Sequence, residues 1–325
     1  QGLGVRIFTG KTLSKGFIDE AKGRYDAVFI GCGHYRSGDI GVPGENLEGV
    51  EDGLKFLQKM RKGDRMTLES PVAVIGGGNT AVDVARCAVR LGGRAIIVYR
   101  RRRQDMPAFP GEVDSALEEG VELMELLAPA KVERNGKDLV LHVRRMKVTG
   151  QDEKGRGIVA PDGRKTDRIR VRRIFSAIGE GPEAVWLQPP KGEKSAVALE
   201  NCLLLPRGKD PVVLYGGDLT AAIKSVVNAV ASGKEAAMAL DTLFRDGPKA
   251  VEGMLKKFRV GGGPALSMEA YLKGPRGERS PHVVAYSEIN KDYFELARRI
   301  SQPRLLIDER RRTFEEVELR VSANI

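Results

Sequence analysis

The stretch Val72-Ala73-Val74-Ile75-Gly76-Gly77-Gly78-Asn79-Thr80-Ala81 decides the fold of this chain. Its four leading apolar residues predict a short buried strand, and the three glycines after them predict a tight turn. Beyond the turn, apolar side chains recur with the spacing of one helix face; they are Val84, Cys87, Ala88 and Leu91. Gly92-Gly93 end this helix, and Ala95–Tyr99 predicts another strand. Strand, helix and strand in this order form a βαβ unit, whose two strands lie parallel in an α/β sheet.

The same stretch has the G-x-G-x-x-A spacing of a dinucleotide-binding turn. In such a turn Gly76 and Gly78 let the backbone approach a pyrophosphate, and Ala81 leaves room for the helix to pack on the strand. The amides at the start of the helix, including those of Asn79 and Thr80, direct their positive ends at the phosphates. These five residues are therefore candidate cofactor contacts. The alternative is a glycine turn in an α/β domain that binds no ligand.

Four consecutive arginines, Arg100–Arg103, follow the second strand. An NAD-specific site usually has Asp or Glu at this position to bind the ribose, whereas arginine favours a 2′-phosphate. The sequence therefore predicts NADP(H) as the ligand. We expect Arg100 and Arg101 to contact the phosphate and the other two side chains to be solvated.

Two further strands run into glycine turns, one on each side of the βαβ unit. Tyr25–Ile30 leads into Gly31-Cys32-Gly33, and Arg173–Ile178 leads into Gly179. Because the two boundaries have the same pattern, we expect one domain to be inserted into another.

A final strand, Val212–Tyr215, leads into Gly216-Gly217-Asp218 and a long helix over residues 223–245. One face of this helix contains Val226, Ala229, Val230 and Gly233. Asp218, at the carboxyl end of a strand, can accept a hydrogen bond from a sugar-like hydroxyl. The alternative role for this carboxylate is a plain helix N-cap.

Several motifs occur together with the glycine turn; they are Val98-Tyr99-Arg100-Arg101, Met106-Pro107-Ala108, Glu112 and Glu119-Gly120-Val121. With Gly76–Ala81 they resemble the small (beta) subunit of glutamate synthase and its pyridine nucleotide-disulfide oxidoreductase relatives. Tyr25–Ile30, Gly33 and Pro43-Gly44-Glu45 resemble that family's first return from the flavin domain, and Gly216-Gly217-Asp218 resembles its second flavin motif. The resemblance covers residues 1–245.

The resemblance implies a Rossmann-like α/β flavoprotein fold in which an NAD(P)-binding domain is inserted into a partial FAD-binding domain. The implied domains are 1–70 (FAD, partial), 71–178 (NADP(H)), 179–247 (FAD, C-terminal part) and 248–325 (C-terminal extension or linker). It also implies cofactor contacts from Gly33, Gly179, Glu180, Gly217, Asp218 and Val226. Nothing before Tyr25 supplies the family's first G-x-G-x-x-G flavin motif. We therefore expect either a fragment of a longer chain or a FAD site completed by another polypeptide.

The activity that the resemblance implies is hydride transfer between NADPH and FAD, followed by electron transfer to an iron-sulfur or other protein acceptor. The cofactors carry this chemistry, so no catalytic acid, base or metal is expected. Glu112 and Glu180 are candidates for lying near the nicotinamide. The competing hypothesis is a non-catalytic NADP(H)-binding sensor or scaffold subunit of an electron-transfer complex.

Composition limits the partners. Lys and Arg number 54 against 44 Asp and Glu, for a net charge of +10, but the aromatic content of 6% and the lack of a binding motif argue against nucleic acid. The three cysteines form no CxxC pair, which excludes a locally built iron-sulfur cluster. The resemblance implies that the partner is an iron-sulfur protein, a ferredoxin-like domain or a larger redox subunit. No apolar run approaches the roughly 18 residues of a membrane span, and a cytoplasmic location is expected.

Overall fold

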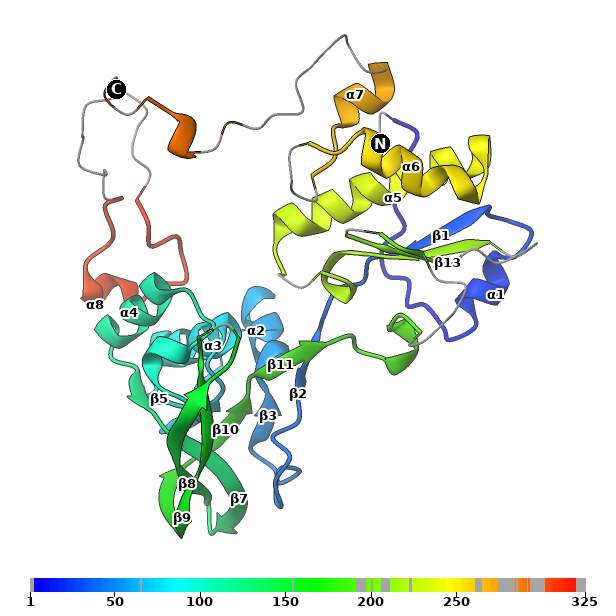
Figure 1. Ribbon diagram of the computed structural model, residues 1–325. Helices are drawn as coiled ribbons and strands as arrows, with labels where there is room; N and C mark the ends of the chain where they lie inside the picture. Colours follow the sequence, from blue (N-terminus) through cyan, green and yellow to red (C-terminus); the bar gives the residue numbers. More distant parts are fainter. Residues whose placement is uncertain are drawn as a thin grey trace. The chain divides into compact units, whose positions relative to one another are not determined.

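The computed structural model describes residues 3–64, 66–153, 155–190, 197–199, 201–205, 211–221, 224–260, 265–273, 284, 286–290, 292 and 302–319. The chain divides into two compact units (Figure 1). The first unit comprises Gln1–His34 and Pro182–Glu295, and the second comprises Tyr35–Gly181 and Leu296–Ile325. Residues 35–181 of the second unit are thus inserted between the two segments of the first, as the paired glycine turns predict.

The unit boundaries lie at 34/35 and 181/182 rather than at the expected 70/71 and 178/179. Strand pairing explains the difference. β3 (Val50–Asp52) pairs in parallel with β10 (Arg173–Ser176), and β2 (Arg36–Gly38) pairs with β11 (Ile178–Gly181). Residues 35–70 therefore contribute two strands to the second unit. Both strands are short and polar, so their sequences do not indicate the distant strands with which they pair.

The second unit is built on a five-stranded sheet in the order β3-β10-β4-β5-β6, with every neighbouring pair parallel. Its remaining strands are β4 (Val72–Ile75), β5 (Ala95–Val98) and β6 (Glu122–Met124). Every residue of β4 and β5 is buried, as expected for central strands of a parallel sheet. The predicted βαβ unit is confirmed, with α3 (Asn79–Arg90) between these two strands.

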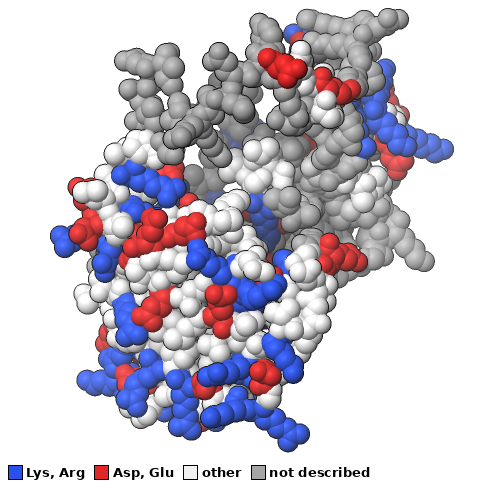
Figure 2. Space-filling model, turned by 60° about the vertical axis from the view of Figure 1, so that its left-hand side comes forward, with Lys and Arg blue, Asp and Glu red and all other residues white. Residues whose placement is uncertain are grey.

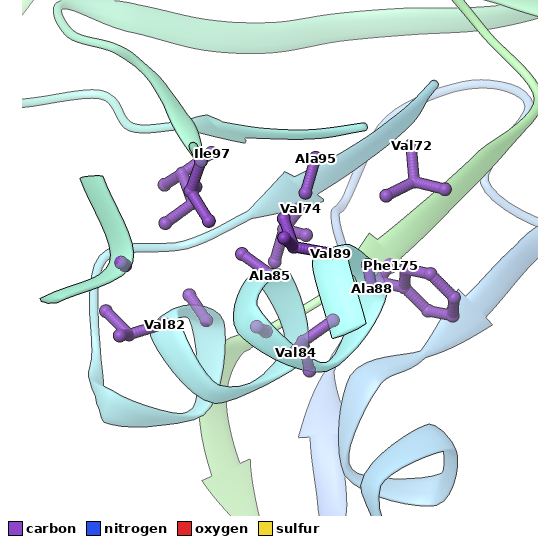
Figure 3. Packing of buried hydrophobic residues seen from close by; sticks show 14 of the residues in the cluster. Val72, Val74, Val82, Val84, Ala85, Ala88, Val89, Ala95, Ile97 and Phe175 are labelled. Atoms are coloured by element: carbon purple, nitrogen blue, oxygen red, sulfur yellow. The ribbon is translucent and has the colours of Figure 1, made fainter. Parts of the chain in front are cut away.

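The two faces of this sheet form two separate cores, because successive side chains of a strand point to opposite sides. Val72 and Val74 pack against α3 and against two further helices, α2 (Gly53–Arg61) and α4 (Pro110–Glu118). Figure 3 shows this face. The ring of Phe175 on β10 joins it, with its centroid 4.6 Å from that of Phe56 on α2.

A three-stranded antiparallel sheet covers the opposite face. It consists of β7 (Leu127–Asn135), β8 (Asp138–Gln151) and β9 (Gly157–Val171). A tight turn joins β7 to β8, with Asn135 paired with Asp138 across it. Leu139, Leu141 and Val143 of β8 are fully buried against Ala73 and Ile75 of β4.

The first unit contains a four-stranded sheet in the order β1-β14-β13-β12. The strands are β1 (Ala27–Ile30), β14 (Val212–Tyr215), β13 (Leu203–Leu205) and β12 (Val197–Ala198). Its helices are α1 (Phe17–Ala21), α5 (Val226–Asp246), α6 (Pro248–Lys257) and α7 (Met268–Lys273). β1 and β14 are parallel, so residues at their carboxyl ends meet at one edge.

Residues after 247 are not a simple extension. Met238 and Ala239 of α5 share a buried cluster with Val251, Met254 and Leu266, so α6 belongs to the first unit. Residues 302–319 belong to the second unit, where α8 (Ile307–Arg310) contacts α4. There Arg310 donates to Glu118 at 3.0 Å, and Arg304 donates to the Ser115 hydroxyl at 2.9 Å.

Among the described residues, no helix combines the length and apolar character needed to cross a membrane. Within the same residues, no group of His, Cys, Asp and Glu side chains is arranged to hold a metal ion.

Replacement of Phe175 by alanine should lower the free energy of unfolding of the second unit by about 3–5 kcal/mol, because a fully buried ring is lost from the contact between α2 and the sheet. Hydrogen exchange of β4 and β10 peptides measures this change, since protection in core strands reports the opening free energy. Phe109→Ala is the matched control, as Phe109 is 66% exposed. A Phe175→Ala effect as small as that of the control would contradict this packing.

Candidate cofactor-binding sites

The glycine turn after β4 has no room for side chains at its first two positions. A Cβ atom at Gly76, whose φ is +151°, would lie 2.3 Å from the Ala177 carbonyl oxygen. A Cβ atom at Gly77 would lie 2.4 Å from the ring of Tyr99. At Gly78 no atom lies within 4 Å of such a Cβ. The turn is therefore packed closely against its own protein on one side and open at its last glycine, as a backbone that receives a ligand requires.

In the part of the chain that the structure describes, the first turn of α3 has backbone N–H groups without acceptors at this open position. Its N-cap is Gly78, which has no side chain to satisfy the amides that follow. The backbone amides of Asn79 and Thr80 have no acceptor among the described residues. Ala81 is fully buried, which confirms its packing role. The free amides, together with the positive end of the helix dipole, make this turn suited to an anionic group.

The side chains of Asn79 and Thr80 are used within the protein. The Asn79 Oδ1 atom accepts a hydrogen bond from the Phe109 amide at 2.9 Å. The Thr80 hydroxyl donates to Glu180 Oε1 at 2.5 Å. These two bonds tie the glycine turn to the start of α4 and to β11, so both residues would reach a ligand through their main chains.

Gly179 and Glu180 are brought to the same edge of the sheet as the glycine turn. Ser176 at the end of β10 pairs with Ile75 at the end of β4, and the Ala177 amide donates to the Ile75 carbonyl at 2.9 Å. Gly179, with φ +59°, adopts the left-handed backbone that leads into β11. Glu112, the other carboxylate expected near the nicotinamide, forms an ion pair with Arg86 on α3.

The four arginines after β5 have four different environments. Arg100 is exposed and has no partner among the described residues. Arg101 donates through Nε to the Gly157 carbonyl at 2.8 Å. Arg102 forms an ion pair with Asp105 at 2.8 Å. Arg103 contacts Asp114 through its side chain and Glu125 through its amide. Arg102 and Arg103 are thus ion-paired rather than simply solvated, which leaves Arg100 and the outer nitrogens of Arg101 available.

Sequence reasoning missed Asp105. Its side chain is only 3% exposed, and it accepts hydrogen bonds from Arg102 and from the Gly157 amide, the latter at 2.8 Å. The Arg102 hydrogen bond, opposed by burial and aided by the Gly157 amide, lowers the pKa of Asp105 to about 2. The Asp105 carboxylate is therefore ionised at neutral pH. Its position three residues after an arginine was the available signal, because that spacing favours an ion pair on a short helical turn.

The first unit brings together its own predicted residues. The Gly216 amide donates to the Ile30 carbonyl at 3.0 Å, so the turns that follow β1 and β14 lie side by side. Gly33 and Gly217 have φ of +68° and +64°, which only glycine adopts without strain. The Gly217 amide donates to the Ser232 hydroxyl at 2.7 Å, which fixes this turn to α5.

Asp218 is half-buried, and its carboxylate accepts no hydrogen bond from the residues that the structure describes. The N-cap alternative is wrong for α5, whose N-cap is Ser225 and whose Asn228 amide donates to the Ser225 hydroxyl at 3.2 Å. Val226 and Val230 share one face, as expected, but they are 80% and 66% exposed. This end of α5 therefore presents apolar surface beside a carboxylate with acceptor capacity.

The comparisons with known proteins agree with this arrangement. The sequence model of the pyridine nucleotide-disulphide oxidoreductase family matches residues 4–233. The chain is 35% identical over 237 residues to the NADP(+)-dependent formate dehydrogenase subunit beta of Moorella thermoacetica, covering 71% of this chain and 33% of that protein. It is 32% identical over 261 residues to the glutamate synthase [NADPH] small chain of Escherichia coli, covering 73% and 54%.

A third relative is the NADPH-Fe(3+) oxidoreductase subunit beta of Geobacter sulfurreducens, 34% identical over 192 residues, with 57% of this chain and 29% of that protein covered. The chain thus spans between about a third and about half of the length of these relatives. FprA of Mycobacterium tuberculosis has a TM-score of 0.50 at 18% identity, with 71% of this chain and 66% of that chain covered, and so shares the fold. The chain therefore belongs to the pyridine nucleotide-disulphide oxidoreductase family, whose cofactors are NADP(H) and FAD, and it is similar within that family to the glutamate synthase small subunit.

Proposed function

We propose that this chain is part of an NADPH-dependent flavoprotein oxidoreductase that passes hydride between NADPH and FAD and then passes electrons to an iron-sulfur or other protein acceptor. One observation carries the proposal. At the carboxyl edge of the parallel sheet, two free amides of α3 lie one strand away from Arg100, which has no protein partner among the described residues. A pyrophosphate and a 2′-phosphate are the anionic groups that such a pair of sites fits.

For NADP(H), the residues have separate roles. The amides of Asn79 and Thr80 would bind the pyrophosphate, with Gly76 and Gly78 allowing its close approach. Arg100 and the outer nitrogens of Arg101 would bind the 2′-phosphate, because guanidinium groups form charge-assisted hydrogen bonds with phosphate oxygens. Gly179 and Glu180 lie beside the glycine turn and would contact the nicotinamide half of the cofactor.

For FAD, the first unit supplies part of a site. The Asp218 carboxylate, at the end of β14, would accept hydrogen bonds from ribityl hydroxyls, and Gly33 and Gly217 would let the backbone approach the flavin. The exposed side chain of Val226 would contact the apolar ring system, because burial of apolar surface away from water is favourable. When bound, NADPH supplies a hydride and FAD accepts it, so the protein residues bind and orient rather than act as acid or base.

The surface charge supports an acidic protein partner. Residues 127–171 contain twelve Lys or Arg against six Asp or Glu. Figure 2 shows many Lys and Arg side chains, interspersed with Asp and Glu, along the lower edge of the view. Arg144 and Arg168 have no acidic partner in the described part of the chain. We propose that this face attracts an acidic iron-sulfur protein or domain, since complementary charge speeds association.

Replacement of Arg100 by alanine should weaken the binding of adenosine 2′,5′-bisphosphate by about 10-fold or more, because a charge-assisted hydrogen bond to phosphate is lost. Binding of 5′-AMP, which lacks the 2′-phosphate, should hardly change. Isothermal titration calorimetry on this chain measures both. Arg103→Ala is the matched control, since the Arg103 side chain already pairs with Asp114. Equal losses in the two variants would refute the assignment of Arg100.

The activity is tested in the full-length natural protein with FAD. Anaerobic mixing with NADPH should bleach the visible absorbance of the oxidised flavin, and NADH should do so less efficiently. Asp218→Ala should raise the Kd for FAD, because the carboxylate that would accept hydrogen bonds from the ribityl hydroxyls is removed. Nucleotide binding without any flavin reduction would contradict the enzymatic proposal and favour the sensor or scaffold alternative.

The same protein tests the partner proposal. Added salt should slow electron transfer to an acidic iron-sulfur acceptor but leave reduction of a neutral dye unchanged, because salt screens exposed charges. Equal sensitivity of the two reactions would remove the support for an electrostatic docking surface.

A further inference from the structure

Hydrogen bonds at one glycine link the arginine segment after β5 to the start of β9. Gly157, the first residue of β9, uses both of its backbone groups for this purpose. Its amide donates to Asp105 Oδ1 at 2.8 Å, and its carbonyl accepts a hydrogen bond from Arg101 Nε at 2.8 Å. Residues separated by more than fifty positions in the sequence are thereby fixed to one another.

Asp105 is held from three directions. Its carboxylate accepts one hydrogen bond from the Gly157 amide. It accepts two more from the Arg102 side chain, at 2.8 Å from Nε and 3.1 Å from Nη2. The Tyr99 hydroxyl donates to the Asp105 carbonyl at 2.8 Å, and the ring of Tyr99 lies under Gly77 of the glycine turn. The Asp105 carboxylate is therefore a fixed point between the glycine turn, the arginines and β9.

This arrangement limits the motion of Arg101 while leaving its donors free. The Gly157 carbonyl accepts from Nε, and the two outer nitrogens of Arg101 have no partner among the described residues. A guanidinium group held at Nε keeps its planar outer edge in one orientation, and a planar edge of two nitrogens can bind a phosphate through two hydrogen bonds. Ordering the side chain before the ligand arrives removes part of the entropy cost of binding.

We propose that Asp105 and Gly157 are positioning residues for the 2′-phosphate site, and that the start of β9 serves as the support that orients Arg101. The inference rests on the proposed binding of NADP(H) by the second unit. It assigns to the three-stranded sheet a role in cofactor selection, in addition to covering the core.

Position 157 has no room for a side chain beside Asp105 and Arg102. A Cβ atom there would lie 2.9 Å from Asp105 Oδ2 and 3.3 Å from Arg102 Nη2. Gly157→Ala would therefore displace the Asp105 carboxylate without removing any charge. Gly150→Ala is the matched control, because Gly150 lies on the neighbouring β8 and a Cβ atom there meets nothing within 4 Å.

The test is titration calorimetry of this chain with adenosine 2′,5′-bisphosphate and with 5′-AMP. Gly157→Ala and Asp105→Asn should each weaken binding of the bisphosphate by about 5- to 30-fold, the range of one or two lost ordering contacts. Binding of 5′-AMP should change less than about 2-fold, and Gly150→Ala should affect neither ligand. Far-UV circular dichroism of each variant establishes that it is folded.

The direction of the Asp105→Asn effect separates positioning from simple electrostatics. Removal of a negative charge near a phosphate site would by itself strengthen bisphosphate binding, whereas loss of the support for Arg101 weakens it. Unchanged or tighter bisphosphate binding in both variants would overturn the inference, as would equal losses for the two ligands. If the unaltered chain does not prefer the bisphosphate to 5′-AMP, the proposed NADP(H) function fails instead.

Discussion

The parallel pairing of β4 with β5 on one side and with β10 on the other is the constraint on which the candidate nucleotide site depends. Parallel strands end at the same edge of a sheet, so the segments that follow them must meet there. The glycine turn, the arginine segment and Gly179-Glu180 follow three different strands, and this pairing brings them to the same edge. Every residue of β4 and β5 is buried, so a one-residue shift of either strand would exchange its side chains between the two cores.

The arginine segment shows how a protein can assign different roles to identical side chains. The Asp105 carboxylate pairs with the Arg102 side chain, and the Asp114 carboxylate pairs with the Arg103 side chain, so the fold neutralises these two cations. Arg100 has no such carboxylate among the described residues. Much of the positive charge in this segment is therefore structural, and the charge available to a ligand is smaller than the sequence indicates.

The local features of the fold could be predicted from the sequence. A buried apolar run before a glycine turn and a helix with regular apolar spacing depend on neighbouring residues, and the sequence therefore predicts the βαβ unit correctly. The pairing of β3 with β10 depends on residues more than a hundred positions apart, and nothing in Val50–Asp52 indicates its partner. Without that information the sequence predicts the unit boundary after residue 70, whereas the structure has it after residue 34.

The candidate sites were predictable to a similar extent. The glycines with positive φ, Gly33 and Gly217, follow from strand–turn patterns. The ion pairs of Arg102, Arg103 and Glu112 do not, since they depend on which side chains the fold places opposite them. The exposure of Val226 could not be predicted either, because helical spacing shows which residues share a face but not what covers that face.

The most direct test of the central claim is hydrogen–deuterium exchange of this chain with and without NADP⁺. The account predicts slower exchange of the amides in 76–81 and 99–105, including those of Asn79 and Thr80, and weaker protection by NAD⁺ at the same concentration. β14 of the first unit should show no such change. Saturating NADP⁺ that protects only the first unit, or that protects neither segment, would contradict the account.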